Sequence, residues 1–373
     1  MDTSVTKCVF FMSMQNNDRI SKSKTSLDFQ VITDTSQMLV TMKRTIKESY
    51  WVFDWDKYKK LVNQYELIYT NGQNISNLRP VSRSFFKLHE ILHDFQPEFS
   101  LSTTNGCTAL FLADGPGGFI EAFHHYRKNN ADNDKLFGVT LLSRDRSIPS
   151  WKIKIPNVTF LQGTDGTGSL YQVKNIDDFA SITCEHGKCD FITADGGFDF
   201  SSDFNNQEKS SLHLILCEIY TAMMTQKKGG CFVIKMYDLF TIKTLQLLSI
   251  LRLSYANMYI TKPHTSRPAN SEKYVVCIGF TNCPTETMFQ LRESVIKSKW
   301  CICDKPFASV VSDIAYFNTF FVSKQLYEIN RVVTAITQPE TIEPVKKQIE
   351  KALRWCYKYN IPINLQTLHS IYR

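Results

Sequence analysis

The sequence predicts an α/β protein in which helices cover both faces of a mostly parallel sheet. Between residues 108 and 280, short apolar runs of strand length alternate with amphipathic runs of helix length, and this alternation is typical of three-layer parallel sheets. The last two apolar runs, 258–261 and 274–280, are joined by a loop without a helical pattern. A parallel pair needs a longer crossover, so we expect the last strand to be antiparallel.

The composition is that of an ordinary globular protein, with 43% hydrophobic and 21% charged residues among 373. This balance excludes a mainly disordered chain, a collagen-like repeat and a coiled-coil rod. No apolar run approaches the roughly 20 residues of a membrane span, and the first residues do not form a signal peptide. The length allows two or three domains, or one large domain with extensions.

The eleven cysteines form no Cys-x-x-Cys pair, so the spacing does not favour a structural zinc site and we expect no metal. We interpret the cysteines as reduced, mostly buried thiols of a cytoplasmic or nuclear protein. The net charge is +7, and the basic excess lies in the last 143 residues. A basic face suits a polyanion such as RNA, although a solvated helical surface explains the same charge equally well.

Residues 1–75 are interpreted as an N-terminal extension. Aromatic side chains at helical spacing, Trp51 and Trp55 among them, predict a helix over 45–67. A second helix is predicted to begin near Ser82 and to end at Pro97.

The central segment, 76–285, holds the predicted sheet, and 286–373 is interpreted as a mostly helical C-terminal extension. The predicted strands are 108–113, 136–142, 158–161, 191–194, 231–235, 258–261 and 274–280. The predicted helices are 119–128, 208–226 and 241–253 in the central segment, and 311–337 and 343–359 in the extension.

A glycine-rich turn, Ala113-Asp-Gly-Pro-Gly-Gly-Phe119, follows the first of these strands and opens a helix. Glycines there let the backbone turn tightly and approach a ligand, beside the positive end of the helix dipole. The spacing is not GxGxxG, so a dinucleotide is a poorer fit. Taken alone, the turn also suits any tight strand-to-helix connection.

Four charged residues stand near the ends of predicted elements: Lys87, Asp195, Lys235 and Glu272. Ligands of open α/β sheets bind at the carboxyl ends of the strands. We therefore expect Asp195 and Lys235, which follow or end neighbouring strands, to point into one crevice. Each residue on its own is more simply explained as a solvated charge, and it is their agreement with one pattern that favours a site.

Together these features resemble the FtsJ/RrmJ family of RNA ribose 2'-O-methyltransferases. Ser82–Ile91 resembles the start of that domain, Asp114–Phe119 resembles its S-adenosylmethionine motif, and the four charged residues match its Lys-Asp-Lys-Glu tetrad in order. The segments 138–141, 163–168 and 266–272 are similar to the branch that methylates mRNA caps in eukaryotes and large DNA viruses. The resemblance covers about residues 80–282 and implies a Rossmann-like, S-adenosylmethionine-dependent methyltransferase sheet.

The resemblance also implies a cofactor site, with the methionine part of S-adenosylmethionine at the glycine turn and the adenine amino group at Asp165. The cofactor-binding residues that it implies are Asp114, Gly115, Pro116, Gly117, Gly118, Phe119 and Asp165. The segment Leu142-Ser-Arg-Asp145 departs from the family pattern. Asp145 is therefore only a weak candidate for the contact to the cofactor ribose.

The tetrad implies how a ribose hydroxyl is activated. Lys235 would act as the general base, provided that its amine is neutral at the moment of attack. Lys87 would lower the pKa of Lys235 as a second cation, Asp195 would hold Lys235, and Glu272 would orient Lys87 or the substrate. Because Asp195 alone raises the pKa of a lysine, the four groups titrate as a coupled set.

The sequence indicates the RNA-contacting residues less clearly than the cofactor site. Lys262 and Arg267, in the loop before Glu272, are candidates for phosphate contacts, and a solvated loop explains them equally well. The aromatic cluster Tyr50–Trp55 offers faces for stacking a cap base, but the helical spacing of Trp51 and Trp55 favours a place in the core.

The leading hypothesis is methyl transfer to the first transcribed nucleotide of capped mRNA. The alternatives are an rRNA or tRNA ribose methyltransferase, or an RNA-binding processing cofactor that keeps the fold. The implied partners are the capped mRNA 5' end and, through the flanks, other capping or transcription proteins, with no membrane. A viral protein of this kind would act at the cytoplasmic site of viral transcription or in the virion.

Overall fold

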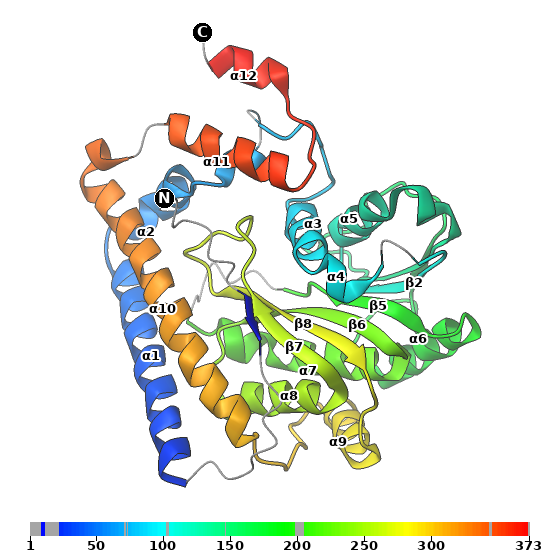
Figure 1. The fold of residues 1–373 in the computed structure, drawn as a ribbon. Coiled ribbons are helices and arrows are strands. Elements are labelled where there is room, and N and C mark those ends of the chain that lie inside the picture. Colours follow the sequence, from blue (N-terminus) through cyan, green and yellow to red (C-terminus); the bar gives the residue numbers. More distant parts are fainter. Residues whose placement is uncertain are drawn as a thin grey trace.

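The computed structural model describes residues 9–11, 22–70, 72, 74–101, 104–145, 147–197, 205–342 and 345–371. Its centre is an eight-stranded sheet in the order β1-β7-β8-β6-β5-β2-β3-β4 (Figure 1). The strands are β1 (Val9–Phe11), β2 (Thr108–Leu112), β3 (Lys135–Val139), β4 (Val158–Leu161), β5 (Cys189–Ala194), β6 (Gln226–Tyr237), β7 (Tyr255–Thr261) and β8 (Glu272–Phe280).

Most of the sheet is parallel, as the sequence predicts. The strands β4, β3, β2, β5 and β6 are joined by parallel ladders, and β8 is antiparallel to both of its neighbours, β6 and β7. The prediction of an antiparallel last strand is therefore confirmed. The short edge strand β1, which pairs with β7, was not predicted.

Helices cover both faces of the sheet, because alternate side chains of each strand point to opposite sides. On one face Leu110 and Ile192 pack with α6 (Val173–Glu185), α7 (Gln207–Thr225) and α8 (Ile242–Ser254). On the other face Phe111 and Phe191 pack with α3 (Ser84–Asp94), α4 (Gln96–Phe99) and α5 (Gly118–Arg127). The predicted strands and the central helices are confirmed within a few residues, except β6, which is longer at both ends, while α6 was not predicted.

The two flanks pack on each other and on the central segment. The long helices α1 (Lys22–Glu48) and α10 (Ala308–Thr337) lie side by side in Figure 1, and α2 (Trp51–Val62) crosses α10. Trp51 and Trp55 are partly buried and pack against this contact, as their helical spacing predicts. The prediction of a single helix over 45–67 is wrong. The helix is interrupted between α1, which ends at Glu48, and α2, which begins at Trp51 and ends at Val62.

The C-terminal part continues the helical layers. The helix α9 (Thr285–Ile296) packs on α7, α11 (Val345–Lys358) lies above α3, and α12 (Leu365–Ile371) follows. Short 3-10 helices complete the structure: η1 (Glu66–Ile68), η2 (Lys128–Asn133) and η3 (Pro339–Thr341).

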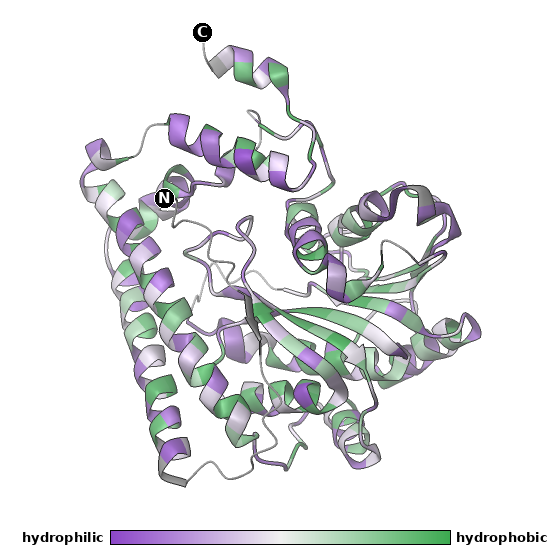
Figure 2. Ribbon diagram, viewed as in Figure 1, coloured by the Kyte–Doolittle hydropathy of each residue, from purple (hydrophilic) through white to green (hydrophobic). Residues whose placement is uncertain are grey.

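Hydrophobic residues gather on the strands and on the helix faces that meet them, whereas α11 is largely hydrophilic (Figure 2). On α11 the buried residues are Ile349, Ala352, Trp355 and Cys356, which recur at helical spacing. Within the described parts of the chain, every helix is too short or too polar to span a membrane.

Candidate active site

The four charged residues of the sequence pattern meet at one edge of the sheet. Asp195 directly follows β5, Lys235 lies near the end of β6, and Glu272 is the first residue of β8. Because β8 runs antiparallel to β6, its first residues lie at the edge where the parallel strands end. Lys87 reaches the same edge from α3, where its amine lies 2.7 Å from the Glu272 carboxylate.

Lys235 is held by Asp195 in two ways. Its Nζ donates to the backbone oxygen of Asp195 at 2.7 Å and lies 3.0 Å from the carboxylate Oδ1. Burial lowers the pKa of Lys235, but the attraction of Asp195, Tyr237 and Glu272 outweighs it and raises the pKa above the ordinary lysine value. In this arrangement Lys235 carries a proton and is fixed in orientation.

Glu272 is the negative counterpart at the centre of the cluster. Burial raises its pKa, but Lys87, Lys235 and Lys262 together lower the pKa of Glu272 to about 2. Its Oε2 accepts the bond from Lys87, while its Oε1 is buried without a hydrogen-bond partner among the described residues. The two lysines and two carboxylates therefore form one cluster of alternating charge.

Two tyrosines belong to the cluster and were missed by the sequence analysis. Tyr274 lies directly opposite Lys235 in the β6–β8 ladder, and its hydroxyl donates to Asp195 Oδ1 at 3.0 Å. Tyr237 lies opposite Glu272, and burial raises its pKa to about 12. The β6–β8 register, had it been predicted, would have identified both, because residues two apart on a strand share a face.

A buried carboxyl group, that of Glu218, binds the backbone directly after Asp195. Glu218 of α7 accepts a hydrogen bond from the backbone N–H of Gly196 at 3.2 Å, and burial raises the pKa of Glu218 to about 8. A side chain at position 196 would collide with Glu218, and one at Gly197 would lie 3.2 Å from Lys235 Nζ. The two glycines after Asp195 therefore allow the close packing on both sides of the turn.

The glycine turn lies at the carboxyl end of β2, whose neighbours are β3 and β5. Gly117 has φ of 112°, a conformation that favours glycine, and Gly115–Pro116 is a cis peptide. A side chain at Gly118 would collide with Ser82 and Ser84, at the start of α3. The turn is thereby packed tightly against the helix that carries Lys87.

Two of the expected cofactor residues are turned away from solvent. The carboxylate of Asp114 is buried and accepts the N–H groups of Phe119 and Ile120, both at 2.9 Å. Phe119 is fully buried and packs near Tyr274. The side chains of Asp114 and Phe119 therefore have partners inside the protein, and their contact to a cofactor stays a prediction.

The other expected cofactor residues are more accessible. Asp165 is exposed beyond β4, and one of its oxygens accepts bonds from Thr167 and from the Asn175 amide. Asp145 is exposed too, in the segment after β3. That segment continues across the glycine turn, where Lys152 donates its N–H to the Pro116 oxygen at 3.1 Å and Ile153 covers Gly117.

The two candidate RNA contacts have different surroundings. The Lys262 amine donates to the backbone oxygens of Asn270 and Glu272, at 2.8 and 2.7 Å. Arg267 makes a two-pronged ion pair with Glu66, at 2.8 and 3.1 Å. The Arg267 guanidinium is therefore already paired within the protein, and its phosphate contact stays a prediction.

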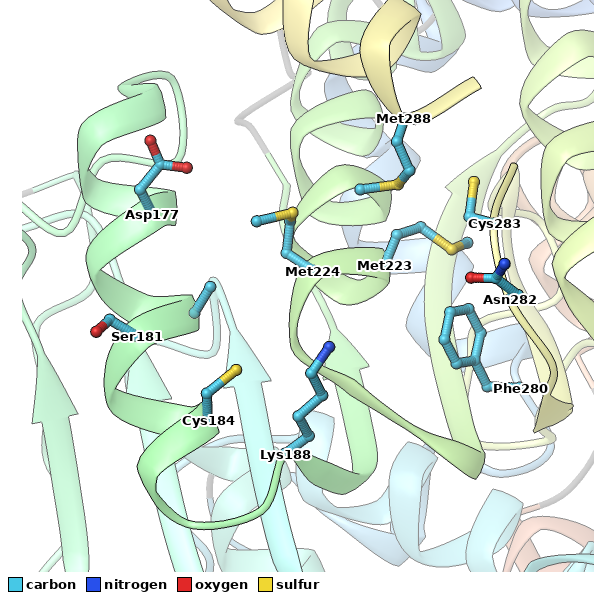
Figure 3. A pocket seen from close by; sticks show the side chains of 11 residues that line it. Asp177, Ser181, Cys184, Lys188, Met223, Met224, Phe280, Asn282, Cys283 and Met288 are labelled. Carbon is cyan, nitrogen blue, oxygen red and sulfur yellow. The ribbon is translucent and has the colours of Figure 1, made fainter. Parts of the chain in front are cut away.

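A separate cavity of about 540 Å³ lies away from this edge, between α6, α7 and the chain after β8 (Figure 3). Its lining residues include Met223, Met224 and Met288, together with Asp177 and Lys188. It contains none of the site residues expected from the sequence. In the described residues no group of three His, Cys, Asp or Glu side chains is placed to hold a metal ion.

Comparison with known proteins decides the family. The model of the FtsJ-like methyltransferases matches residues 80–280, more than half of the chain. The chain belongs to this family. The matched residues of this FtsJ-like methyltransferase begin just before α3 and end with β8, so they include all four charged residues of the cluster.

Several relatives are named as cap-specific mRNA (nucleoside-2'-O-)-methyltransferases. The chain is 31% identical over 213 residues to "Cap-specific mRNA (nucleoside-2'-O-)-methyltransferase 1" of Trypanosoma brucei brucei (strain 927/4 GUTat10.1), covering 55% of this chain and 57% of that protein. The protein of that name from Trypanosoma cruzi (strain CL Brener) is 29% identical over 69% of this chain and 75% of its own length. "Cap-specific mRNA (nucleoside-2'-O-)-methyltransferase 2" of Mus musculus is 27% identical over 68% of this chain.

The match covers only part of the length of these relatives. The matched part spans 57% of the first and 34% of the mouse protein.

Proposed function

We propose that this protein transfers a methyl group from S-adenosylmethionine to a ribose 2'-hydroxyl of RNA, at the first transcribed nucleotide of capped mRNA. One observation carries the proposal: Lys87, Asp195, Lys235 and Glu272 meet at one edge of the sheet. The glycine turn of an FtsJ-like methyltransferase domain lies at the same edge. The relatives named for cap-specific mRNA methylation support capped mRNA as the substrate.

The residues at this edge are of types that can bind the groups of S-adenosylmethionine. The glycine turn lies where the strand order changes direction, which is where open α/β sheets bind ligands. The exposed carboxylate of Asp165 suits a hydrogen bond from an adenine amino group, and Gly115, Gly117 and Gly118 would hold the methionine part. When bound, S-adenosylmethionine supplies an activated methyl group on a sulfonium.

The chain's own task is to position the hydroxyl and remove its proton. Lys235 Nζ would take the proton of the ribose hydroxyl as that oxygen accepts the methyl group. Asp195 and Tyr274 fix the direction of that amine. Since the surroundings raise the pKa of Lys235 in the free protein, the amine must release its proton before it can accept another.

The test replaces Lys235 with Ala and with Arg. Both variants should lose methyl transfer to capped RNA by about 10²–10⁴-fold or more, since guanidinium stays protonated and cannot act as a base. Both should keep their affinity for the cofactor in calorimetry, because the glycine turn is untouched.

Lys227 gives a matched control, because it lies on the same strand and pairs with Asp190 at 2.7 Å, but its side chain is 54% exposed. Lys227→Arg should methylate at the wild-type rate. A Lys235→Arg enzyme that is nearly as active as wild type would refute the base assignment.

A further inference from the structure

A small basic pocket opens beside the candidate active site. Its volume is about 210 Å³, and it lies where the loop after β7, the chain after α2, and the helices α10 and α11 meet. The lining residues that matter here are Tyr65, Lys262, His264, Lys324, Arg331 and Lys351.

The positive charge of the pocket comes from three separate parts of the chain. Lys262 belongs to the loop after β7, Lys324 and Arg331 to α10, and Lys351 to α11. Lys324 and Arg331 are seven residues apart and therefore lie on one face of α10. The one acidic residue of the lining is Glu328, which Arg331 contacts at 2.8 Å. The pocket thus places Lys324, Arg331 and Lys351 around one carboxylate, with Lys262 in its wall, an arrangement that a bound anion would stabilise.

The pocket is joined directly to the candidate active site. The Lys262 amine reaches the backbone oxygen of Glu272, at 2.7 Å. Burial, with Lys273 and Lys87 nearby, lowers the pKa of Lys262 to about 7. An anion in the pocket would favour the charged form of this amine.

The size and the walls of the pocket indicate which anion fits. Its volume is below the roughly 300–1,000 Å³ of pockets for drug-sized ligands, so it suits a phosphate group better than a whole nucleotide. At one side the rings of Tyr65 and His264 stack with their centroids 4.7 Å apart. Phosphate groups of RNA are commonly held by lysine and arginine side chains, while aromatic rings contact bases.

We propose that this pocket binds the phosphate groups at the 5' end of the RNA substrate. The position beside Glu272 would hold the terminal phosphates while the first ribose reaches Lys235. This inference rests on the proposed function, and it gives residues of the C-terminal helices α10 and α11 a direct part in recognising the 5' end.

The test removes two cations of the pocket in the full chain, as Lys324→Ala with Lys351→Ala. The control, Lys305→Ala with Lys346→Ala, changes the net charge equally at two exposed lysines outside the pocket lining. Three RNAs of one sequence are compared, with a cap, with a 5' triphosphate and with a 5' hydroxyl. Binding is measured by fluorescence anisotropy over a range of salt concentrations, and methyl transfer is measured on the capped RNA.

The double variant should bind the capped and triphosphate RNAs about 10-fold or more weakly, with a shallower salt dependence, and should bind the 5'-hydroxyl RNA as wild type does. The KM for capped RNA should rise while kcat changes little. If the double variant bound all three RNAs equally more weakly, the pocket would contact internal phosphates and the proposal would be overturned. Unchanged affinity for the capped and triphosphate RNAs would overturn it too. If wild type binds with this preference but transfers no methyl group, the proposed function fails and the pocket assignment stands.

Discussion

Lys235 shows how a few neighbours decide the chemical state of one amine. Its side chain is 8% exposed, and burial alone would favour the neutral form. Asp195 reverses that preference at a distance of 3.0 Å. Lys87 was expected from the sequence to be the cation that lowers this pKa, whereas the structure pairs Lys87 with Glu272. The negative partners therefore outweigh the second lysine.

This electrostatic balance predicts the pH dependence of the reaction. A base must be neutral to act, and the pKa of Lys235 in the free protein is raised above the ordinary value of about 10.4. Because kcat/KM reports the groups of the free enzyme, it should rise with pH through the alkaline range without levelling below about pH 9. Initial rates at low concentrations of capped RNA, in buffers of constant ionic strength, measure this. A plateau that begins near pH 7 would show that another group is the base.

Single residues also show where the sequence is informative about the site. Lys87, Asp195, Lys235 and Glu272 were predicted because each stands near an element end and fits one family pattern. Asp114 and Phe119 fit the same pattern, but their side chains hold the turn and the core. Burial of that kind depends on neighbours distant in the chain, which a linear pattern does not reveal.

At the scale of elements, strands were easier to predict than helices. Buried parallel strands are continuous apolar runs with turn residues at their ends, as in β2 and β5. The helix α6 was missed because its sequence mixes small, polar and apolar residues, and its burial comes from packing on α7. Tyr274 was missed for a related reason, since its place opposite Lys235 depends on the register between strands.

Glu90 joins three elements around the candidate site. Its carboxylate accepts the backbone N–H groups of His264 and Thr265, in the loop after β7, and the indole N–H of Trp355 in α11. Glu90 itself belongs to α3, one turn beyond Lys87. The loop that leads to Glu272 is thus fastened to the helix that carries Lys87.

Glu90→Gln tests this junction through the pH dependence of stability. Burial raises the pKa of Glu90 from 4.5 to about 7, so the folded state favours the protonated form. The wild type should therefore lose stability relative to the Gln variant as pH rises from about 4 to 8, by up to about 3 kcal/mol. The free energy of unfolding in urea at both pH values measures the change.

Glu350→Gln on the exposed side of α11 serves as the control for this comparison. Its stability relative to wild type should be nearly the same at both pH values. If the stability difference between wild type and Glu90→Gln were also the same at both pH values, the carboxyl group of Glu90 would not have the raised pKa that its burial implies.

At the scale of the whole molecule, the flanks are built into the sheet domain. The side chains of Leu291, Val310 and Phe321 belong to the same buried cluster as Leu110 and Ile192 of the central strands. The family match spans residues 80–280 and lies inside the boundaries expected at 75 and 285, which stay a prediction. Deleting 286–373 would expose this cluster, so point substitutions are better tests of its role.

One buried ion pair ties the N-terminal helix to the strands of the site. Lys43 of α1 lies 3.1 Å from Asp238, just after β6, and its amine also donates to Ser271, just before β8. Their side chains are only 9% and 7% exposed. Lys273 lies 3.8 Å from the same carboxylate and compensates part of the charge.

Lys43→Met should destabilise the fold by about 3 kcal/mol, because removing one partner leaves a buried carboxylate incompletely neutralised. Lys47→Met, at an exposed position on the same helix, should change stability by less than about 0.5 kcal/mol. Chemical denaturation of both variants measures the difference. Equal stability of the two would mean that Lys273 alone neutralises Asp238.

The place of β8 between β6 and β7 has a consequence for how the protein is made. During synthesis β6 and β7 emerge from the ribosome before β8, so their facing edges must wait unpaired until residues 272–280 follow. The apolar side of α1 stays without its partner α10 for longer, because α10 begins 260 residues after α1 ends. Pairings this distant close late and leave apolar surface open meanwhile. The growing chain is therefore expected to expose apolar surface until residues 272–280 have been translated, when Glu272 and Tyr274 can join Lys235 in the charged cluster.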